Sequence, residues 1–247
     1  MSFPSYLTEA HRLLEISGAS YPPVSLADVV GKCQDIRVSF DDIEGDGFLV
    51  DLGVLGTQVV LKKEAPEVRQ RFTLAHELGH WVLNNQHGQV RKVGSLKVEE
   101  WCNEFAAELL MPSEWVRRCV LDLSIDSFWK MLGLPKIFYV SAEAFYKKVP
   151  EVTPVSTFCV SETAKGSTKV TQLKSAECPV SLLPYMKQLA SKILENKKKG
   201  AIQVASNLFC FYMLRHSSGK SKDYVVFLVP SQDGLTISCT RRSQLRG

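Results

Sequence analysis

Two histidines and a glutamate in one short stretch have the types and spacing that metal chemistry needs. Residues 71–83 read RFTLAHELGHWVL and contain the pattern H-E-x-x-H. On a helix, His76 and His80 lie one turn apart on the same face, where both imidazoles can bind one zinc ion. Glu77 beside them can accept a proton from a water held by that ion. Gly79 costs about 1 kcal/mol in a helix interior, so we expect a close neighbour against its bare backbone.

A catalytic zinc site usually has a third protein ligand. The extended pattern with a third histidine is absent, because His87 lies one residue out of register. A glutamate from a later helix is the other common solution, and residues 99–111 (EEWCNEFAAELLM) have a helical pattern. Glu99 follows His80 by 19 residues, which leaves room for a loop and an antiparallel return. We expect Glu99 to be the third ligand, with Glu100 as the alternative.

The predicted ligand helix has two polar faces. Glu99 and Asn103 share one of them at i and i+4, flanked by two alanines that permit close approach of another helix. Asn103 is therefore expected to hold a ligand or a backbone group in place. The other glutamates (Glu100, Glu104 and Glu108) follow a neighbouring face, which is expected to lie in solvent.

Peptide hydrolysis at such a metal would also need a place for the substrate and a donor for the oxyanion. The strand pattern at residues 57–62 directly precedes the histidine helix and is a candidate edge for an extended substrate. Tyr139, Tyr146 and His87 are candidate donors, and the sequence does not choose among them. Zn²⁺ is the expected cofactor, while Mn²⁺ or another divalent metal also suits these ligands.

The two motif segments occur in an order that is typical of a known family. The form R-F-T-L-A-H-E-x-x-H precedes E-x-x-[AC]-N-x-x-A-A-x-x-L-M-P, which residues 71–80 and 99–112 follow. With these two segments the chain resembles the ImmA/IrrE family of metallopeptidases. The resemblance implies that Glu99, four residues before Asn103, is the third ligand. It also implies a protein substrate, an XRE-type helix-turn-helix transcriptional repressor whose cleavage derepresses stress-response or mobile-element genes.

Sequence patterns divide the chain into three parts of an α+β protein. Residues 1–112 are predicted to form a zincin-like metallopeptidase domain, with a small sheet, the H-E-x-x-H helix and the ligand helix. Residues 113–150 hold short helices that resemble a helix-turn-helix segment packed on that domain. Residues 151–247 combine strand patterns with a helix at 181–199, which predicts an α+β domain with an antiparallel sheet. By resemblance, this last part is a sensor or regulatory domain of GAF type.

The formal charge is uneven along the chain. Residues 1–150 carry 16 Lys+Arg and 20 Asp+Glu, a net −4, whereas residues 151–247 carry 14 and 6, a net +8. A basic C-terminal part can attract nucleic acid, although its aromatic residues lie on apolar strand patterns typical of a core. Two alternatives to a peptidase therefore stay open. One is a regulator with a structural or degenerate metal site, and the other is direct nucleic-acid binding.

The sequence also indicates the cellular compartment in which we expect the protein. No apolar run approaches the roughly 20 residues that span a bilayer, and the N-terminus lacks the basic start and apolar core of a signal peptide. The seven cysteines are scattered, odd in number and without a C-x-x-C pair. This favours reduced thiols over a disulfide framework or a cysteine zinc site. We expect a cytoplasmic protein without a membrane partner.

Overall fold

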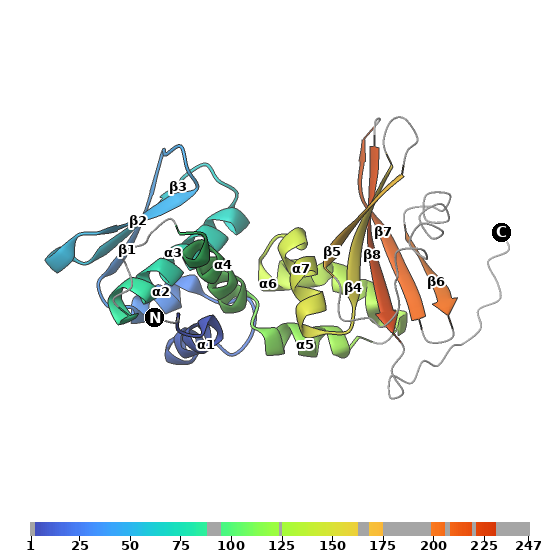
Figure 1. Ribbon diagram of the computed structural model, residues 1–247, viewed down its shortest axis with the longest axis horizontal. Helices are drawn as coiled ribbons and strands as arrows, with labels where there is room; N and C mark the ends of the chain where they lie inside the picture. Colours follow the sequence, from blue (N-terminus) through green and yellow to red (C-terminus); the bar gives the residue numbers. More distant parts are fainter. Residues whose placement is uncertain are drawn as a thin grey trace. The chain divides into compact units, whose positions relative to one another are not determined.

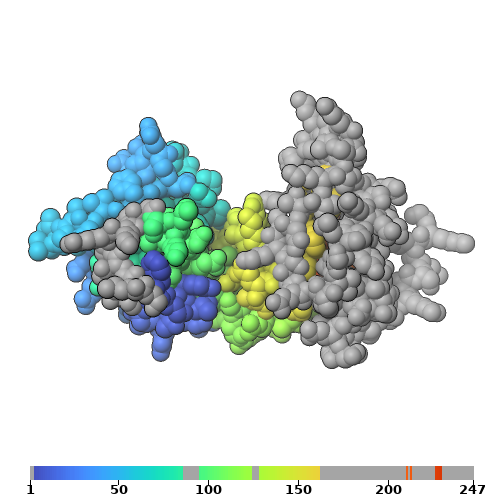
Figure 2. Space-filling model, viewed as in Figure 1, coloured from blue at the N-terminus to red at the C-terminus, as the bar shows by residue number. Residues whose placement is uncertain are grey.

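The computed structural model of the chain describes residues 3–87, 95–123, 125–162, 168–174, 199–205, 208–218 and 221–230 (Figures 1 and 2). It is a mixed α+β structure with two compact units. The first comprises Met1–Cys119 and Met131–Lys148, and the second Val120–Lys130 and Val149–Gly247. The division into catalytic, helical and regulatory domains stays a prediction. No helix in the described part of the chain has the length and apolar composition to cross a membrane.

The sheet of the first unit has three strands in the order β1-β3-β2. β3 (Thr57–Lys62) runs parallel to β1 (Ile36–Asp41) and antiparallel to β2 (Gly47–Asp51). The prediction that residues 57–62 form an edge for substrate is therefore wrong, because β3 is the central strand. Its alternate residues, Thr57, Val59 and Leu61, are all buried, which suits a strand with a neighbour on each side. The two edges of this sheet, among the described strands, are β1 and β2.

α3 (Glu67–His87) carries the H-E-x-x-H motif and packs between this sheet and α4 (Leu96–Leu110) (Figure 1). Its buried apolar face includes Ala75, Leu78 and Val82. Gly79 faces α4, where a Cβ atom built on it would lie 3.2 Å from the Cα of Cys102. The expected close neighbour of Gly79 is thus the backbone of the ligand helix.

α4 begins at Ser95, whose hydroxyl accepts a hydrogen bond from the Val98 amide, and it is covered by other helices at its C-terminal end. The prediction that Glu108 lies in solvent is wrong, because its side chain is completely buried. It accepts hydrogen bonds from His11 (2.9 Å), from the Ser113 hydroxyl (2.6 Å) and from Lys148 (2.9 Å). These donors replace water around the carboxylate, and they come from α1 (Tyr6–Ser17), α5 (Ser113–Leu121) and α7 (Ala142–Val152).

The helix-turn-helix-like segment contains the 3₁₀ helix Ile125–Gly133, α6 (Leu134–Phe138) and α7. Of the two adjacent lysines in α7, Lys148 is buried on Glu108 and Lys147 pairs with Glu143 at 2.8 Å. Phe138 and Phe145 pack together with ring centroids 5.3 Å apart. The contacts of these helices are those of packing elements.

The second unit is built on an antiparallel sheet, as the sequence predicts. Its strand order is β5-β4-β8-β7-β6, and every neighbouring pair runs antiparallel. The aromatic residue Tyr212 is 3 % exposed, and Phe128 packs edge-on against Phe227. These side chains therefore belong to a core. The strands are β4 (Ser156–Glu162), β5 (Thr168–Lys174), β6 (Lys199–Ala205), β7 (Leu208–Ser218) and β8 (Ser221–Pro230). The predicted helix at 181–199 falls, except for its last residue, outside the described residues.

Candidate metal centre

α3 and α4 bring the three predicted ligands together. The Nε2 atoms of His76 and His80 are 3.2 Å apart. Glu99 approaches them with one oxygen 3.2 Å from His76 Nε2 and the other 3.6 Å from His80 Nε2. Ligands on a tetrahedral zinc ion with bonds near 2.1 Å stand about 3.4 Å apart. The three donors thus surround a gap of the size and ligand chemistry that a divalent metal requires.

Asn103 fixes the orientation of one histidine. The Nδ1–H of His76 donates to the Asn103 side-chain oxygen at 3.0 Å, and an amide oxygen can only accept. This hydrogen bond requires a proton on Nδ1, and it leaves Nε2 as the nitrogen that faces Glu99 and His80. A metal-binding histidine is commonly held in this way by its second nitrogen. Asn103 lies where the sequence predicts a positioning residue.

The second histidine is set up to be neutral. Its Nε2 approaches His76 Nε2 at 3.2 Å. Burial and the nearby His76 lower the pKa of His80, against an opposing effect of Glu99. These effects favour the neutral imidazole, which is the form that binds a metal ion.

Glu77 lies in the same cavity but does not belong to the ligand cluster. Its residue is only 7 % exposed. Burial raises the pKa of Glu77 to about 7, and the negative charge of Glu99 acts in the same direction. A carboxyl group in this environment can take up and release a proton near neutral pH. A divalent cation in the cluster would favour the carboxylate and so oppose the shift.

The cluster opens into a cavity of about 440 Å³, a volume usual for ligand sites. α3, α4 and the start of β2 line it, including Gly47, Phe48 and Leu49. A Cβ on Gly47 would come within 2.6 Å of the Thr73 side chain and 2.9 Å of the Val60 carbonyl oxygen. Glycine at this position therefore lets the free edge strand lie directly against the metal helix.

Of the three predicted oxyanion donors, Tyr139 and Tyr146 are not among the residues that line this cavity. Tyr139 donates its hydroxyl hydrogen bond to Glu67, and its ring lies under the Arg71 guanidinium at 5.0 Å. Tyr146 is 4 % exposed and packs against Phe145. His87 is the last residue of α3, and its side chain lies outside the described residues.

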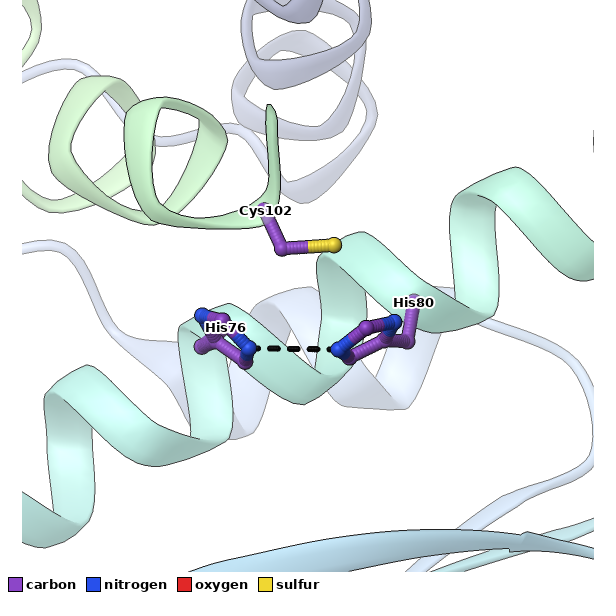
Figure 3. Close-up of side chains that lie close together, drawn as sticks. All are labelled: His76, His80 and Cys102. Atoms are coloured by element: carbon purple, nitrogen blue, oxygen red, sulfur yellow. Dashed lines mark hydrogen bonds between the residues drawn. The ribbon is translucent and has the colours of Figure 1, made fainter. Parts of the chain in front are cut away.

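Sequence reasoning missed two polar residues of the centre. Asn84 lines the cavity, and its spacing of four from His80 could have found it. Cys102 places its sulfur and the ring nitrogens of His76 and His80 within 4.8 Å of one another (Figure 3). Its place in an apolar helical pattern indicated only a core residue. Its spacing of three from Glu99 was the available indication that both side chains reach the same centre.

A pair of helices that carries two histidines and two carboxylates at a cavity, beside a small mixed sheet, defines a domain of the metallopeptidase class. Residues 32–149 match the family Peptidase_M78, described as the IrrE N-terminal-like domain. Residues 32–149 thus form an IrrE N-terminal-like domain, which confirms the predicted ImmA/IrrE relationship for this part of the chain.

Solved structures give a similar picture of the fold. Eleven chains match, among them a Mycobacterium tuberculosis transcriptional regulator with a TM-score of 0.52 and 14 % sequence identity. The similarity covers 93 % of this chain and 77 % of that chain, and at this identity it concerns the fold alone. The comparison with curated proteins found no similar sequence.

Proposed function

We propose that the protein is a metal-dependent endopeptidase, with His76, His80 and Glu99 as metal ligands and Glu77 as the general base. The observation that carries the proposal is the cluster itself. Three donor atoms stand 3.2 to 3.6 Å apart, and a buried carboxyl of raised pKa lies in the same cavity. Zn²⁺ is the proposed ion, and Mn²⁺ or another divalent metal would also fit this set.

Different residues of the chain have different roles in the proposed reaction. A bound divalent ion would lower the pKa of its water from 15.7 to about 7 and would polarise the scissile carbonyl. The Glu77 carboxylate accepts the proton of the attacking water and returns it to the leaving amine nitrogen. Asn103 holds the His76 ring with its Nε2 toward the cluster. Asn84, whose side chain lines the cavity, is our candidate donor to the oxyanion.

The free edge of β2 is the proposed substrate platform, in place of β3. An extended peptide that pairs with Gly47–Asp51 would run along the wall of the cavity, because the first residues of this strand line it. Phe48, which is 43 % exposed, and Phe72 supply apolar surface there. This arrangement selects a substrate with an unfolded or extended segment.

The proposed substrate is an XRE-type helix-turn-helix transcriptional repressor, cleaved to derepress stress-response or mobile-element genes. The relationship to the ImmA/IrrE family supports a role in regulation. We further propose that residues 151–247 form a sensor or regulatory domain of the GAF type that the resemblance suggests, and that residues 113–150 serve as packing elements of the peptidase.

The test is incubation of the full-length protein, loaded with Zn²⁺, Mn²⁺ or Co²⁺, with helix-turn-helix repressors encoded near its gene. Fragments are identified by mass spectrometry. We expect one cleaved repressor with the wild-type protein and none with Glu77→Gln, which keeps all three ligands. Failure of every metal, or equal cleavage by Glu77→Gln, would contradict the proposal.

The Glu77→Gln variant also distinguishes proteolysis from the alternative that the protein regulates by contact alone. If Glu77→Gln binds metal and still supports derepression in cells, proteolysis is not the function. Direct nucleic-acid binding rests on the net +8 of residues 151–247. It predicts that the full chain binds DNA at low salt and loses affinity steeply as salt rises.

A further inference from the structure

The thiol of Cys102 occupies an unusual position for a core cysteine. Its sulfur lies within 4.8 Å of ring nitrogens of both His76 and His80, over the gap between the two imidazoles (Figure 3). The residue is 0 % exposed, whereas the side chain of Glu99 is 39 % exposed. The cluster thus has a fourth candidate donor, Cys102, on its buried side, whereas the carboxylate of Glu99 lies on its exposed side.

Packing explains the Cα and Cβ of this residue but not its sulfur. The Cα and Cβ of Cys102 are the atoms that a side chain on Gly79 would meet, at 3.2 and 3.3 Å. Alanine at position 102 would supply the same helix contact. The additional atom of cysteine is the one that reaches the histidines.

We propose that Cys102 is a fourth protein ligand of the bound metal, so that the centre can close as His-His-Glu-Cys. The inference rests on the same ligand cluster as the proposed peptidase. Ligation replaces the S–H bond by a sulfur–metal bond, and the proton leaves to solvent. In a tetrahedral zinc site, sulfur and nitrogen ligands stand about 3.6 Å apart, so the sulfur has to approach the nitrogens by at most about 1.2 Å.

Charge favours this fourth ligand in a buried site. A divalent ion with two neutral histidines and one glutamate has a net charge of +1 over its ligands, and the Glu77 carboxylate offsets this charge only from outside the cluster. A thiolate bound to the ion brings the ligand set itself to zero. Soft thiolate also prefers Zn²⁺ and Co²⁺ to Mn²⁺, so Cys102 selects among the metals that the other three ligands accept.

The closed centre has a consequence for the proposed activity. A catalytic zinc site keeps one position for water, and structural sites fill all four. With Cys102 bound, the zinc form is a resting state, and release of the thiol opens the position that water needs. Mn²⁺, which the thiol does not hold, leaves that position open.

Cobalt replaces zinc in the spectroscopic test, because it reports its ligands by absorption. The full-length wild-type protein with one equivalent of Co²⁺ should show thiolate-to-cobalt charge transfer in the near ultraviolet. Cys102→Ala should lose this band, whereas Glu99→Gln should keep it. Cys33→Ala removes a buried thiol that does not belong to the cluster and is the matched control. A wild-type protein without the band, or a band that survives Cys102→Ala, would overturn the proposal.

Two further measurements keep the result independent of folding and of peptidase activity. Zinc K-edge X-ray absorption of the wild-type protein should give one sulfur ligand near 2.3 Å, and only nitrogen and oxygen neighbours would refute the proposal. In chelator competition, Cys102→Ala should lose about tenfold or more in Zn²⁺ affinity while its Mn²⁺ affinity stays within about twofold. These readouts need no substrate, so failure to find a cleaved repressor leaves them unaffected.

Discussion

Replacement of Gly79 by alanine should damage the metal centre through the helix contact alone. The new methyl group would meet the Cα and Cβ of Cys102 at 3.2 and 3.3 Å and a ring carbon of Phe105 at 3.2 Å. Cys102 and Phe105 are both 0 % exposed, and the nearest of these atoms is α4 backbone. A backbone atom cannot rotate away, so α4 has to shift by a few tenths of an ångström.

Two opposing contributions set the expected stability. Alanine gains about 1 kcal/mol over glycine in a helix interior. Overpacking of a tight core costs about 1–3 kcal/mol. Gly79→Ala should therefore lower the free energy of unfolding by about 0–2 kcal/mol. The matched control is Gly31→Ala in α2 (Leu26–Lys32), where nothing lies within 4 Å of the added methyl group and only the gain remains.

Thermal unfolding by circular dichroism compares the two variants. Gly31→Ala should raise the melting temperature, and Gly79→Ala should fall below it by about 2 °C or more. Zinc affinity gives the functional readout. Metal–ligand distances tolerate only about 0.2 Å, so displacement of Glu99 with α4 should weaken Zn²⁺ binding by about tenfold. If Gly79→Ala is as stabilising as Gly31→Ala and binds zinc as the wild type does, the contact between Gly79 and α4 does not limit the metal centre.

Three other variants test single groups. Asn103→Ala should lose about 10- to 100-fold in Zn²⁺ affinity by chelator competition, because His76 loses the partner of its Nδ1–H. Glu77→Gln should bind metal as tightly as wild type but lose about 100-fold or more in cleavage rate. Burial acts to raise the pKa of Glu108, but the Ser113 hydrogen bonds and the Lys148 charge outweigh it, and its pKa is lowered. Its contribution is therefore complete above its unfolded value of 4.5 and is lost as pH falls through the folded pKa. Glu108→Gln should flatten that part of an acid-unfolding curve and cost about 3–5 kcal/mol at neutral pH.

The centre could be predicted from the sequence because its geometry is local. His76, Glu77 and His80 lie within one helical turn of each other, and helix geometry alone puts the two histidines on one face. Glu99 and Asn103 repeat this spacing on α4, and both now contact His76. Only the pairing of the two helices needed information beyond local spacing, and the family resemblance supplied it.

Features that depend on the order of packing could not be predicted in this way. The central position of β3 follows from the crossover that makes it parallel to β1, and no alternation within residues 57–62 encodes strand order. Glu108 repeats the spacing of Glu100 and Glu104, which are exposed, yet His11 lies 97 residues before it and Lys148 lies 40 residues after it. A helical pattern cannot show which distant helices will cover its face.

Cys102 has two roles in this centre. It sets the distance between α3 and α4, and it carries a candidate metal ligand. Its Cα and Cβ meet the Gly79 backbone, while its sulfur reaches the histidines. Gly79→Ala moves the whole of α4, whereas Cys102→Ala leaves the helix contact intact and removes only sulfur. If the thiol is a ligand, Cys102→Ala should lose the cobalt charge-transfer band, while its melting temperature without metal stays close to that of the wild type. Gly79→Ala should weaken the band together with every other sign of metal binding. The pair of variants therefore separates loss of a ligand from displacement of the helix that carries it.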